Sequence, residues 1–357
     1  MKKIYTQPRI ETVATTPQQM LCASEGIKAK ISGYKNTGGG FSQTPPYIWL
    51  AGIVCSSLLF LGTACSTNNP DQPKQQAELK PRTLIVKTSP QPSPKERGIL
   101  RLPQATITEN GEVLDALWNA GDEVFYRNLS REAYTDPQEG SVKLSGTLRA
   151  DKKGSVASFS GDRVWCTEED QLALIYPNNP ADFTLHDLLT ASYTISVAGQ
   201  NGTLETLAKD FHHIYGIASV VSVTGTTANA ELAEMKSLMT VCKFSFVDGS
   251  GNQLPISTLQ ISIVGGAYAG TYPQEGTVSI AQSTPAWDVS VEPDWETTTP
   301  LTIDTKGANP EEVYVALFPA AGVTYNFTVT SGGSTYTGEA TATLNEGEYV
   351  VAPLKLE

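Results

Sequence analysis

Histidine and cysteine, the residues that most often hold metals or act as nucleophiles, are scarce in this chain of 357 residues. It has three histidines and five cysteines, and no Cys-x-x-Cys pair. His212 and His213 are adjacent, so they point to opposite faces of a strand or lie about 100° apart on a helix. Neither arrangement suits two ligands of one metal. With His186 alone elsewhere, the sequence predicts no metal centre and no cofactor.

Motifs of the common catalytic sites are missing as well. There is no Gly-x-Ser-x-Gly, no Walker A sequence and no dinucleotide fingerprint. Asp248, Ser250 and Asn252 copy the first half of a calcium loop, but Leu259 stands where the bidentate acid is needed. The acidic run 168–170 is typical of a solvated loop. We therefore expect that the protein is not an enzyme.

Clustered basic residues are also lacking, and the formal net charge is −12. A surface that binds phosphates needs grouped Lys and Arg. Nucleic acid is therefore not an expected partner.

A long apolar run is present once, from Tyr47 to Ala64, and it ends in Thr63-Ala64-Cys65. Its length suits a secretory signal or a short membrane span, and the chain turns polar and Pro-rich directly after Cys65. The pattern predicts a bacterial lipoprotein signal in which residues 61–65 form a loose lipobox and Cys65 becomes the acylated first residue. A transmembrane anchor and a buried core helix are the alternatives, but a core helix would carry a polar face.

The predicted cleavage divides the chain into a leader and a mature protein. Residues 1–46 form an atypical N-terminal extension, and 47–64 are the apolar part of the signal. A chain that begins at Cys65 has 293 residues (357 less 64) and a formal charge of −16, from 19 basic and 35 acidic residues. Besides Cys65 it retains Cys166 and Cys242, which form one disulfide or serve as two small buried hydrophobes.

Residues 65–98 are expected to be a lipid-anchored, flexible tether that contains one short strand, 83–87. Three prolines in 89–98 exclude a strand there. From about Gln104 onward, short runs of Thr, Val, Ile and Tyr alternate with Gly, Asn, Asp and Pro, which is typical of many short antiparallel strands.

The clearest strands lie near the C-terminus. Residues 313–318 end at a proline, 323–330 alternate apolar and polar positions, Gly332-Gly333 predicts a turn, and 335–344 and 349–356 complete the series. Residues 241–247 and 259–264 flank a turn-like sequence, 248–252, and predict a hairpin. Helical periodicity is limited to 230–239 and, more weakly, 203–215. These patterns predict an all-β protein with one domain at 99–235 and a second at 236–357.

Several short segments resemble one family when they are taken in order. They are Trp118-Asn-Ala-Gly121-Asp122 with the strand 123–126, Phe159-Ser160-Gly161, Leu174-Ile-Tyr176-Pro177, Gln200-x-Gly202, Ala316-Leu-Phe-Pro319, and Gly347-Glu-Tyr349 with Leu354-Lys355-Leu356. Behind a lipoprotein signal, this series resembles the Bacteroidales fimbrillin-like surface lipoproteins. Two departures are the 46 residues before the signal and the Pro-rich stretch 89–98.

The resemblance implies two tandem transthyretin-like antiparallel β-sandwich domains in a subunit, anchor or tip of a surface fimbrium. It also implies trimming at an arginine, after which a neighbour's strand fills the groove left by the lost first strand. The strand to be lost would be Thr83, Leu84, Ile85, Val86 and Lys87. Arg97 or Arg101 would be the processing site, because a cut after Arg82 leaves this strand attached. The implied partners are other fimbrial subunits, the outer membrane through the lipid on Cys65, and a host or bacterial surface receptor.

Each family segment also has a purely structural interpretation, which we favour. Trp118, Tyr176 and Phe318 are expected to be core aromatics that close the ends of the sandwiches. Three glycines are expected to occupy turns that need a positive φ; they are Gly121, Gly161 and Gly202.

Other functions remain open on the sequence alone. If residues 66–98 are only a tether, the protein is an uncut anchor or a monomeric lipoprotein of the outer-membrane surface that binds glycan or protein ligands. Trp287 and Trp295 are the only clustered tryptophans that could stack on a sugar, but Pro293 interrupts the strand between them, which favours core or edge packing. A tip adhesin is a third alternative.

Overall fold

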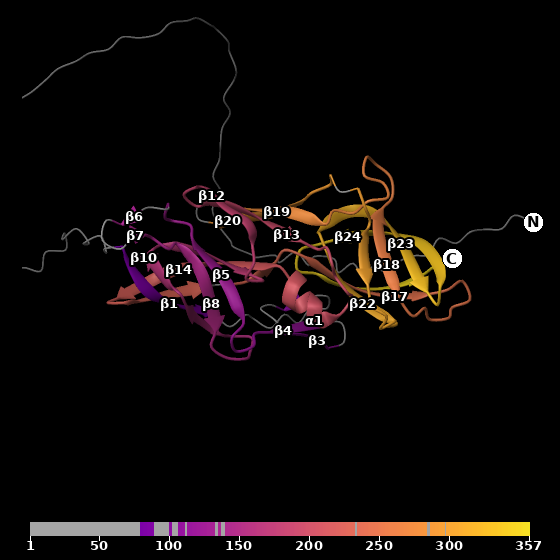
Figure 1. Cartoon of the computed structure of the whole chain (residues 1–357), viewed down its shortest axis with the longest axis horizontal. Coiled ribbons are helices and arrows are strands. Elements are labelled where there is room, and N and C mark those ends of the chain that lie inside the picture. Colours follow the sequence, from indigo (N-terminus) through magenta and orange to yellow (C-terminus); the bar gives the residue numbers. More distant parts are fainter. Residues whose placement is uncertain are drawn as a thin grey trace, which may run out of the picture. The chain divides into compact units, whose positions relative to one another are not determined.

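A computed structural model describes the part of the chain that begins at Leu79. The described residues are 79–88, 100–101, 106–110, 113–132, 135–136, 140–232, 234–283, 286–296 and 298–357. The leader 1–46, the apolar run 47–64, Cys65 and Arg97 lie outside them, as does most of the expected tether. The regular secondary structure of the described part is almost entirely β-strand (Figure 1), so the all-β prediction is confirmed.

The first sheet has nine strands and closes on itself. Its order begins with β10 (Arg163–Cys166), β1 (Lys80–Thr88), β15 (Thr227–Leu232) and β14 (Ile214–Thr224), and continues with β11 (Gln171–Tyr176), β5 (Glu123–Asn128), β8 (Ser145–Ala150) and β9 (Ser158–Gly161). Strand β16 (Lys236–Ser237) pairs with β14. Because β9 also pairs with β1, the strands from β1 to β9 form a continuous ring.

A four-stranded sheet combines strands from both sides of the expected domain boundary at residue 235. Its order is β12 (Ala181–Asp187), β13 (Thr190–Ser196), β19 (Glu275–Ser283) and β20 (Ala286–Pro293). Seven residue pairs join β13 to β19, from Thr190↔Ala281 to Ser196↔Glu275. The division into 99–235 and 236–357 stays a prediction, and these two stretches share a sheet.

Two further sheets form the C-terminal sandwich. One consists of β22 (Glu312–Leu317), β17 (Thr240–Val247) and β25 (Tyr349–Lys355), and the other of β21 (Leu301–Asp304), β18 (Thr258–Ile263), β23 (Ala320–Ser331) and β24 (Ser334–Leu344). They pack face to face, since the Phe244 and Phe327 rings lie 5.2 Å apart. The strands expected near the C-terminus are confirmed, and Gly332 and Gly333 form their turn with positive φ.

The remaining elements are short. A three-stranded sheet has the order β2 (Leu100–Arg101), β4 (Val113–Leu117), β3 (Thr106–Asn110), and β6 (Thr135–Asp136) pairs with β7 (Gly140–Ser141). Helical structure in the described residues is limited to α1 (Leu204–Thr206) and η1 (Leu207–Phe211), so the weaker helix prediction, 203–215, is confirmed only in part. No helix among the described residues is long and apolar enough to cross a membrane.

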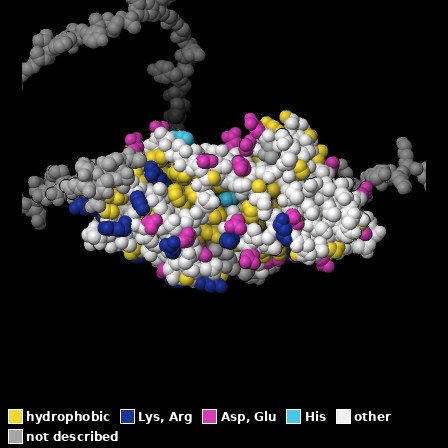
Figure 2. Space-filling model, viewed as in Figure 1, with side chains coloured by type: hydrophobic (Ala, Val, Ile, Leu, Met, Phe, Trp, Pro, Cys, Tyr) yellow, Lys and Arg dark blue, Asp and Glu magenta, His cyan; other side chains and the backbone are white. Residues whose placement is uncertain are grey.

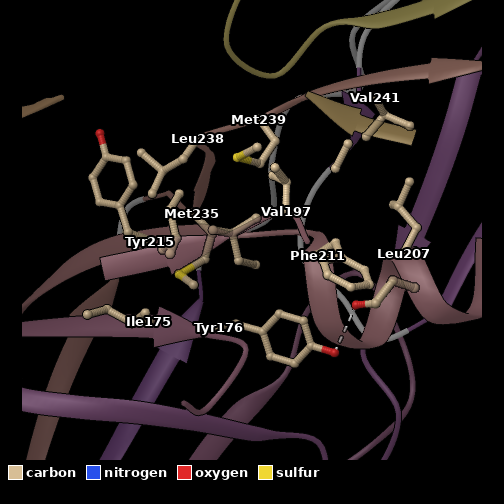
Figure 3. Packing of buried hydrophobic residues seen from close by; sticks show 14 of the residues in the cluster. Ile175, Tyr176, Val197, Leu207, Phe211, Tyr215, Met235, Leu238, Met239 and Val241 are labelled. Carbon is tan, nitrogen blue, oxygen red and sulfur yellow. Dashed lines mark hydrogen bonds between the residues drawn. The ribbon is translucent and has the colours of Figure 1, made fainter. Parts of the chain in front are cut away.

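The stronger helix prediction, 230–239, is wrong. Ala230 and Leu232 end strand β15 with both side chains buried, and β16 follows. Three apolar residues of this segment, Met235, Leu238 and Met239, are buried in the hydrophobic core, as Figure 3 shows. A period of two and tertiary burial therefore outweigh the helix propensity of Ala, Glu and Met here.

The predicted hairpin of residues 241–247 and 259–264 is also wrong. Asp248 does organise a tight turn, since its Oδ1 accepts the backbone N–H groups of Ser250 and Asn252. The flanking strands, however, belong to different sheets: β17 pairs with β22 and β25, whereas β18 pairs with β21 and β23. The turn folds the chain back on the end of β17, where Val247 is bridged to Gln253, and the residues after it lead to β18 in the other layer.

The aromatic residues of the family segments form core, as predicted. Trp118 is fully buried and meets Phe159 and Tyr176 edge-on, with ring centroids 4.8 and 5.7 Å apart. Tyr176 donates to the Ala208 carbonyl at 3.0 Å, which ties β11 to η1 (Figure 3). Phe318 is 1% exposed. These segments therefore contribute packing contacts.

The prediction of turn glycines holds for Gly121 and Gly202, whose φ values are +89° and +80°. It is wrong for Gly161, which lies in β9 opposite Leu148 and is not among the positive-φ glycines. A Cβ built on Gly161 would lie 2.4 Å from the Thr147 carbonyl oxygen. Close approach of two strands, and not backbone conformation, requires glycine at this position.

Cys166 and Cys242 are both free and buried, so the alternative of two small buried hydrophobes is the one that the structure has. Burial raises the pKa of the Cys166 thiol to about 11 and also raises the pKa of Cys242.

Candidate assembly site at strand β1

Strand β1 contains all five residues of the predicted removable strand. Thr83, Ile85 and Val86 are β-branched, and the alternation along the strand places Leu84 and Val86 fully inside, whereas Thr83 and Lys87 are exposed. Burying two aliphatic side chains of this size contributes roughly 1.5–3 kcal/mol each. The prediction of a short strand at 83–87 is therefore confirmed, and the structure adds which face of that strand is buried.

Both edges of β1 are paired. On one side it runs parallel to β15 over six pairs, from Thr83↔Thr227 to Thr88↔Leu232. On the other side it is antiparallel to β10 over Lys80–Thr83 and to β9 over Val86 and Lys87. In Figure 1 the indigo β1 accordingly lies beside strands that come much later in the sequence. This strand is therefore what closes the ring of the first sheet.

The neighbours of the buried β1 residues define the walls of the position that β1 fills. Leu84 is paired with Ala228 and Val86 with Ala230 on β15, while Val86 also faces Phe159 on β9. Residues paired across a sheet have side chains on the same face. All of these side chains are almost fully buried. We call this position, walled by β15, β9 and β10, the β1 groove.

Arg82 is the member of this site that the sequence patterns did not single out. Its side chain is 4% exposed and lies on the same face as Leu84 and Val86. Its Nη1 donates to the Lys80 carbonyl at 3.1 Å and to the Cys166 carbonyl at the end of β10. Because Cys166 is 84 residues away, only the fold shows this contact.

The far end of β1 is held by a reciprocal pair of hydrogen bonds. The Thr88 hydroxyl donates to the Ala157 carbonyl at 3.1 Å and accepts the Ala157 N–H at 3.2 Å. The β1 groove therefore has a polar anchor at each end and two aliphatic positions between them.

Of the two predicted processing residues, only Arg101 is among the residues that the structure describes. Arg97 lies outside the described residues. Arg101 lies in β2, where it is paired with Asp115 of β4. A protease that cuts at Arg101 therefore has to unpair β2 first, because proteases bind an extended, unpaired backbone. Arg82 is buried within β1 and is protected in the same way.

A second polar centre joins β3 to the C-terminal sandwich. Glu109 accepts hydrogen bonds from Tyr314 at 2.6 Å, Tyr349 at 2.9 Å and Lys243 at 3.0 Å. Burial raises the pKa of Glu109, but these three hydrogen bonds outweigh it and hold the pKa below the ordinary 4.5. Lys243 also pairs with Glu312 at 2.9 Å. No local sequence pattern points to this cluster, since its members come from four separate strands.

No protein-family model matches the chain, and no curated protein matches it in sequence. Among solved structures, it is similar to a candidate cell adhesion protein from Bacteroides ovatus, with 13% identity, a TM-score of 0.43 and coverage of 78% of this chain and 92% of that one. A candidate cell adhesion protein from Bacteroides uniformis has 13% identity, a TM-score of 0.45 and coverage of 80% and 94%. A fimbrial protein from Bacteroides ovatus has 12% identity, a TM-score of 0.33 and coverage of 78% and 50%.

Trp287 and Trp295, the candidate sugar platform, have different surroundings. Trp287 lies in β20 and packs, partly buried, against the core. Trp295 lies beyond the end of that strand and stacks on Tyr268, with ring centroids 5.7 Å apart, while Tyr272 meets it edge-on at 6.5 Å. The two tryptophans therefore have different packing partners: Trp287 contacts the core, and Trp295 contacts Tyr268 and Tyr272.

The face of the molecule shown in Figure 2 carries interspersed charges. Acidic side chains are spread along it, and most of its Lys and Arg side chains lie over the strands of the first sheet. In the described residues no group of His, Cys, Asp and Glu is arranged to hold a metal ion.

Proposed function

We propose that this chain is a structural or adhesive subunit of a cell-surface fimbrium, in which β1 is a temporary occupant of the groove. The observation that carries the proposal is the double pairing of β1: it precedes both candidate processing arginines in sequence, yet it closes the first sheet.

Loss of β1 would expose the strand edges with which it pairs. The edge of β15 and the facing edges of β9 and β10 would present unpaired backbone donors and acceptors, and the slot between them would be apolar. Such edges bind an added strand, because it satisfies the hydrogen bonds and the apolar contacts together. A strand from a neighbouring subunit therefore restores the closed ring and joins two copies.

The remaining parts of the proposal come from the sequence. Cys65 is the acylated residue that delivers the protein to the outer membrane, and cleavage after Arg97 or Arg101 separates β1 from the rest of the chain. Both cuts have this effect, since both arginines follow Thr88. The partners are other fimbrial subunits.

The alternative is an uncut surface lipoprotein. With β1 in place, the first sheet is complete and needs no partner, which suits an anchor subunit or a monomeric lipoprotein that binds glycan or protein ligands. The two proposals share the same fold and differ in the N-terminus of the mature protein.

Intact mass and N-terminal sequencing of the protein recovered from cell envelopes distinguish them. A start at Gly98 or Leu102 supports assembly by strand addition, whereas a lipid-modified start at Cys65 in the assembled form rules out the cleavage. Arg97→Ala and Arg101→Ala, singly and together, should identify the site that is cut. Lys95→Ala is the matched control, because it removes a neighbouring positive charge but no arginine.

A further inference from the structure

We infer that the β1 groove selects its incoming strand by a buried cation: the strand carries Arg or Lys at the position of Arg82 and aliphatic residues two and four positions later. This inference rests on the proposed function and specifies the partner of that site. The partner is a strand of another subunit with the pattern Arg/Lys-x-aliphatic-x-aliphatic.

The cation requirement follows from the contacts of Arg82. Its side chain is 4% exposed, yet it is charged, and burying a charge is costly unless it is hydrogen-bonded. The guanidinium meets this condition by donating to the carbonyls of Lys80 and Cys166. The Cys166 carbonyl belongs to β10, which is a wall of the groove and stays when β1 leaves. Any replacement strand therefore meets the same acceptor at the same end.

The two aliphatic positions follow from the opposite walls. Alanines 228 and 230 on β15 leave room for a branched side chain, and Phe159 and Val164 bound the groove on the other side. Leu84 and Val86 fill the slot with no remaining exposure. A charged residue at either position would be buried among apolar side chains without a partner.

The cation also fixes the direction of the strand. Alternation of side chains alone permits either direction, because a reversed strand still presents every second residue to the groove. A reversed strand would place its cation at the Val86 end, against Phe159, and its aliphatic residue at the Cys166 carbonyl. The incoming strand therefore runs as β1 does, parallel to β15.

Peptide exchange on the whole mature chain tests this pattern. An arginine-specific protease is used to cut the expected tether, so that the β1 fragment remains in the groove without a covalent link. A labelled peptide with the sequence of residues 80–88 is then added, and its binding is measured by fluorescence anisotropy. The variants are Arg82→Ala, Arg82→Lys, Leu84→Glu and the reversed sequence, with Thr83→Ala as the control because Thr83 faces outward.

We expect Arg82→Ala to weaken binding by about ten-fold or more, as loss of charge-assisted hydrogen bonds in a buried site does. Arg82→Lys should retain most of the affinity, Thr83→Ala should bind like the parent peptide, and Leu84→Glu and the reversed sequence should fail to bind. If Arg82→Ala or the reversed peptide binds as tightly as the parent, the inference is overturned and the proposed function stands. If the parent peptide itself never enters the cut protein, both fall.

Discussion

The side-chain amide of Gln200 is hydrogen-bonded to both backbone groups of Ala316. Its Nε2 donates to the Ala316 carbonyl at 2.9 Å, and its Oε1 accepts the Ala316 N–H at 2.7 Å. Gln200 thus takes the place of a neighbouring strand beside β22, and it is 3% exposed. Two segments that resembled one family, Gln200-x-Gly202 and Ala316-Leu-Phe-Pro319, are in direct contact.

Replacing Gln200 with alanine should therefore destabilise the protein. Gln200→Ala leaves the N–H and carbonyl of Ala316 without these partners in a buried site, which costs on the order of 1–3 kcal/mol. Urea unfolding measures the change. Gln282→Ala is the control, because Gln282 is exposed on β19 and should change stability by less than about 0.5 kcal/mol. Equal midpoints for the two variants would contradict the role of Gln200.

Glu109 should give the protein a pH-dependent part of its stability. Its pKa is lowered in the folded state, so its contribution is present above the ordinary value of 4.5 and is lost as pH falls through the lower folded value. Glu109→Gln should cost on the order of 1–3 kcal/mol at pH 7, because the bonds from Lys243, Tyr314 and Tyr349 lose their charged acceptor.

Unfolding curves at pH 7 and at successive values below 4.5 test this expectation. The difference between Glu109→Gln and the parent protein should shrink over the acidic part of that range. Glu292→Gln, on the exposed edge strand β20, serves as the control and should show no such trend. A difference that stays constant down to acid pH would show that Glu109 acts by packing alone.

Gly161→Ala should loosen the first sheet at the strand that meets β1. The added methyl group would lie 2.4 Å from the Thr147 carbonyl oxygen, so β8 and β9 have to separate, at a cost of about 1–3 kcal/mol. Gly249→Ala is a matched control, because a Cβ there meets nothing within 4 Å and its φ is not positive. Thermal unfolding that ranks the two variants equally would refute the close-approach explanation.

The tryptophans of residues 287–295 are expected to act in packing. On a glycan array and in affinity gels, the parent protein and the Trp287→Ala, Trp295→Ala double variant should show the same retention. Trp295→Ala should lower the melting temperature, since Trp295 stacks on Tyr268 and meets Tyr272 edge-on. Sugar retention that disappears in the double variant while the fold persists would favour the glycan-binding alternative.

Local patterns in the sequence predicted strands well and partners poorly. The alternation in β23 was sufficient to predict that strand and its buried face, because a period of two is a local property, and residues 83–87 were predicted as a strand without a buried face. The hairpin of 241–247 with 259–264 failed because a turn sequence does not state whether the chain stays in one sheet or crosses to the next. The helix at 230–239 failed because tertiary burial of Met235 and Leu238 decides that segment.

The polar residues with structural roles were also missed, because local sequence patterns do not reveal distant partners. Arg82, Glu109 and Gln200 are ordinary polar residues in their local sequence, and their roles arise from partners that are 84, 134 and 116 residues away. Such contacts leave no periodicity or motif. Residues 83–87, the strand predicted to be removed, were recognised in the sequence as a strand, whereas the contact of Arg82 with the Cys166 carbonyl was not.

The pairing of β13 with β19 sets an order of events for a chain that is synthesised from its N-terminus. Strand β13 ends at Ser196, but its partner β19 begins only at Glu275. Strand β1 ends at Thr88, and its parallel partner β15 begins at Thr227. One edge of each of these two strands must therefore remain unpaired until residues far downstream are available, since contacts distant in sequence form late. The first sheet and the β13–β19 pairing therefore close late, and a truncated product that stops before residue 275 should be a substrate for proteases.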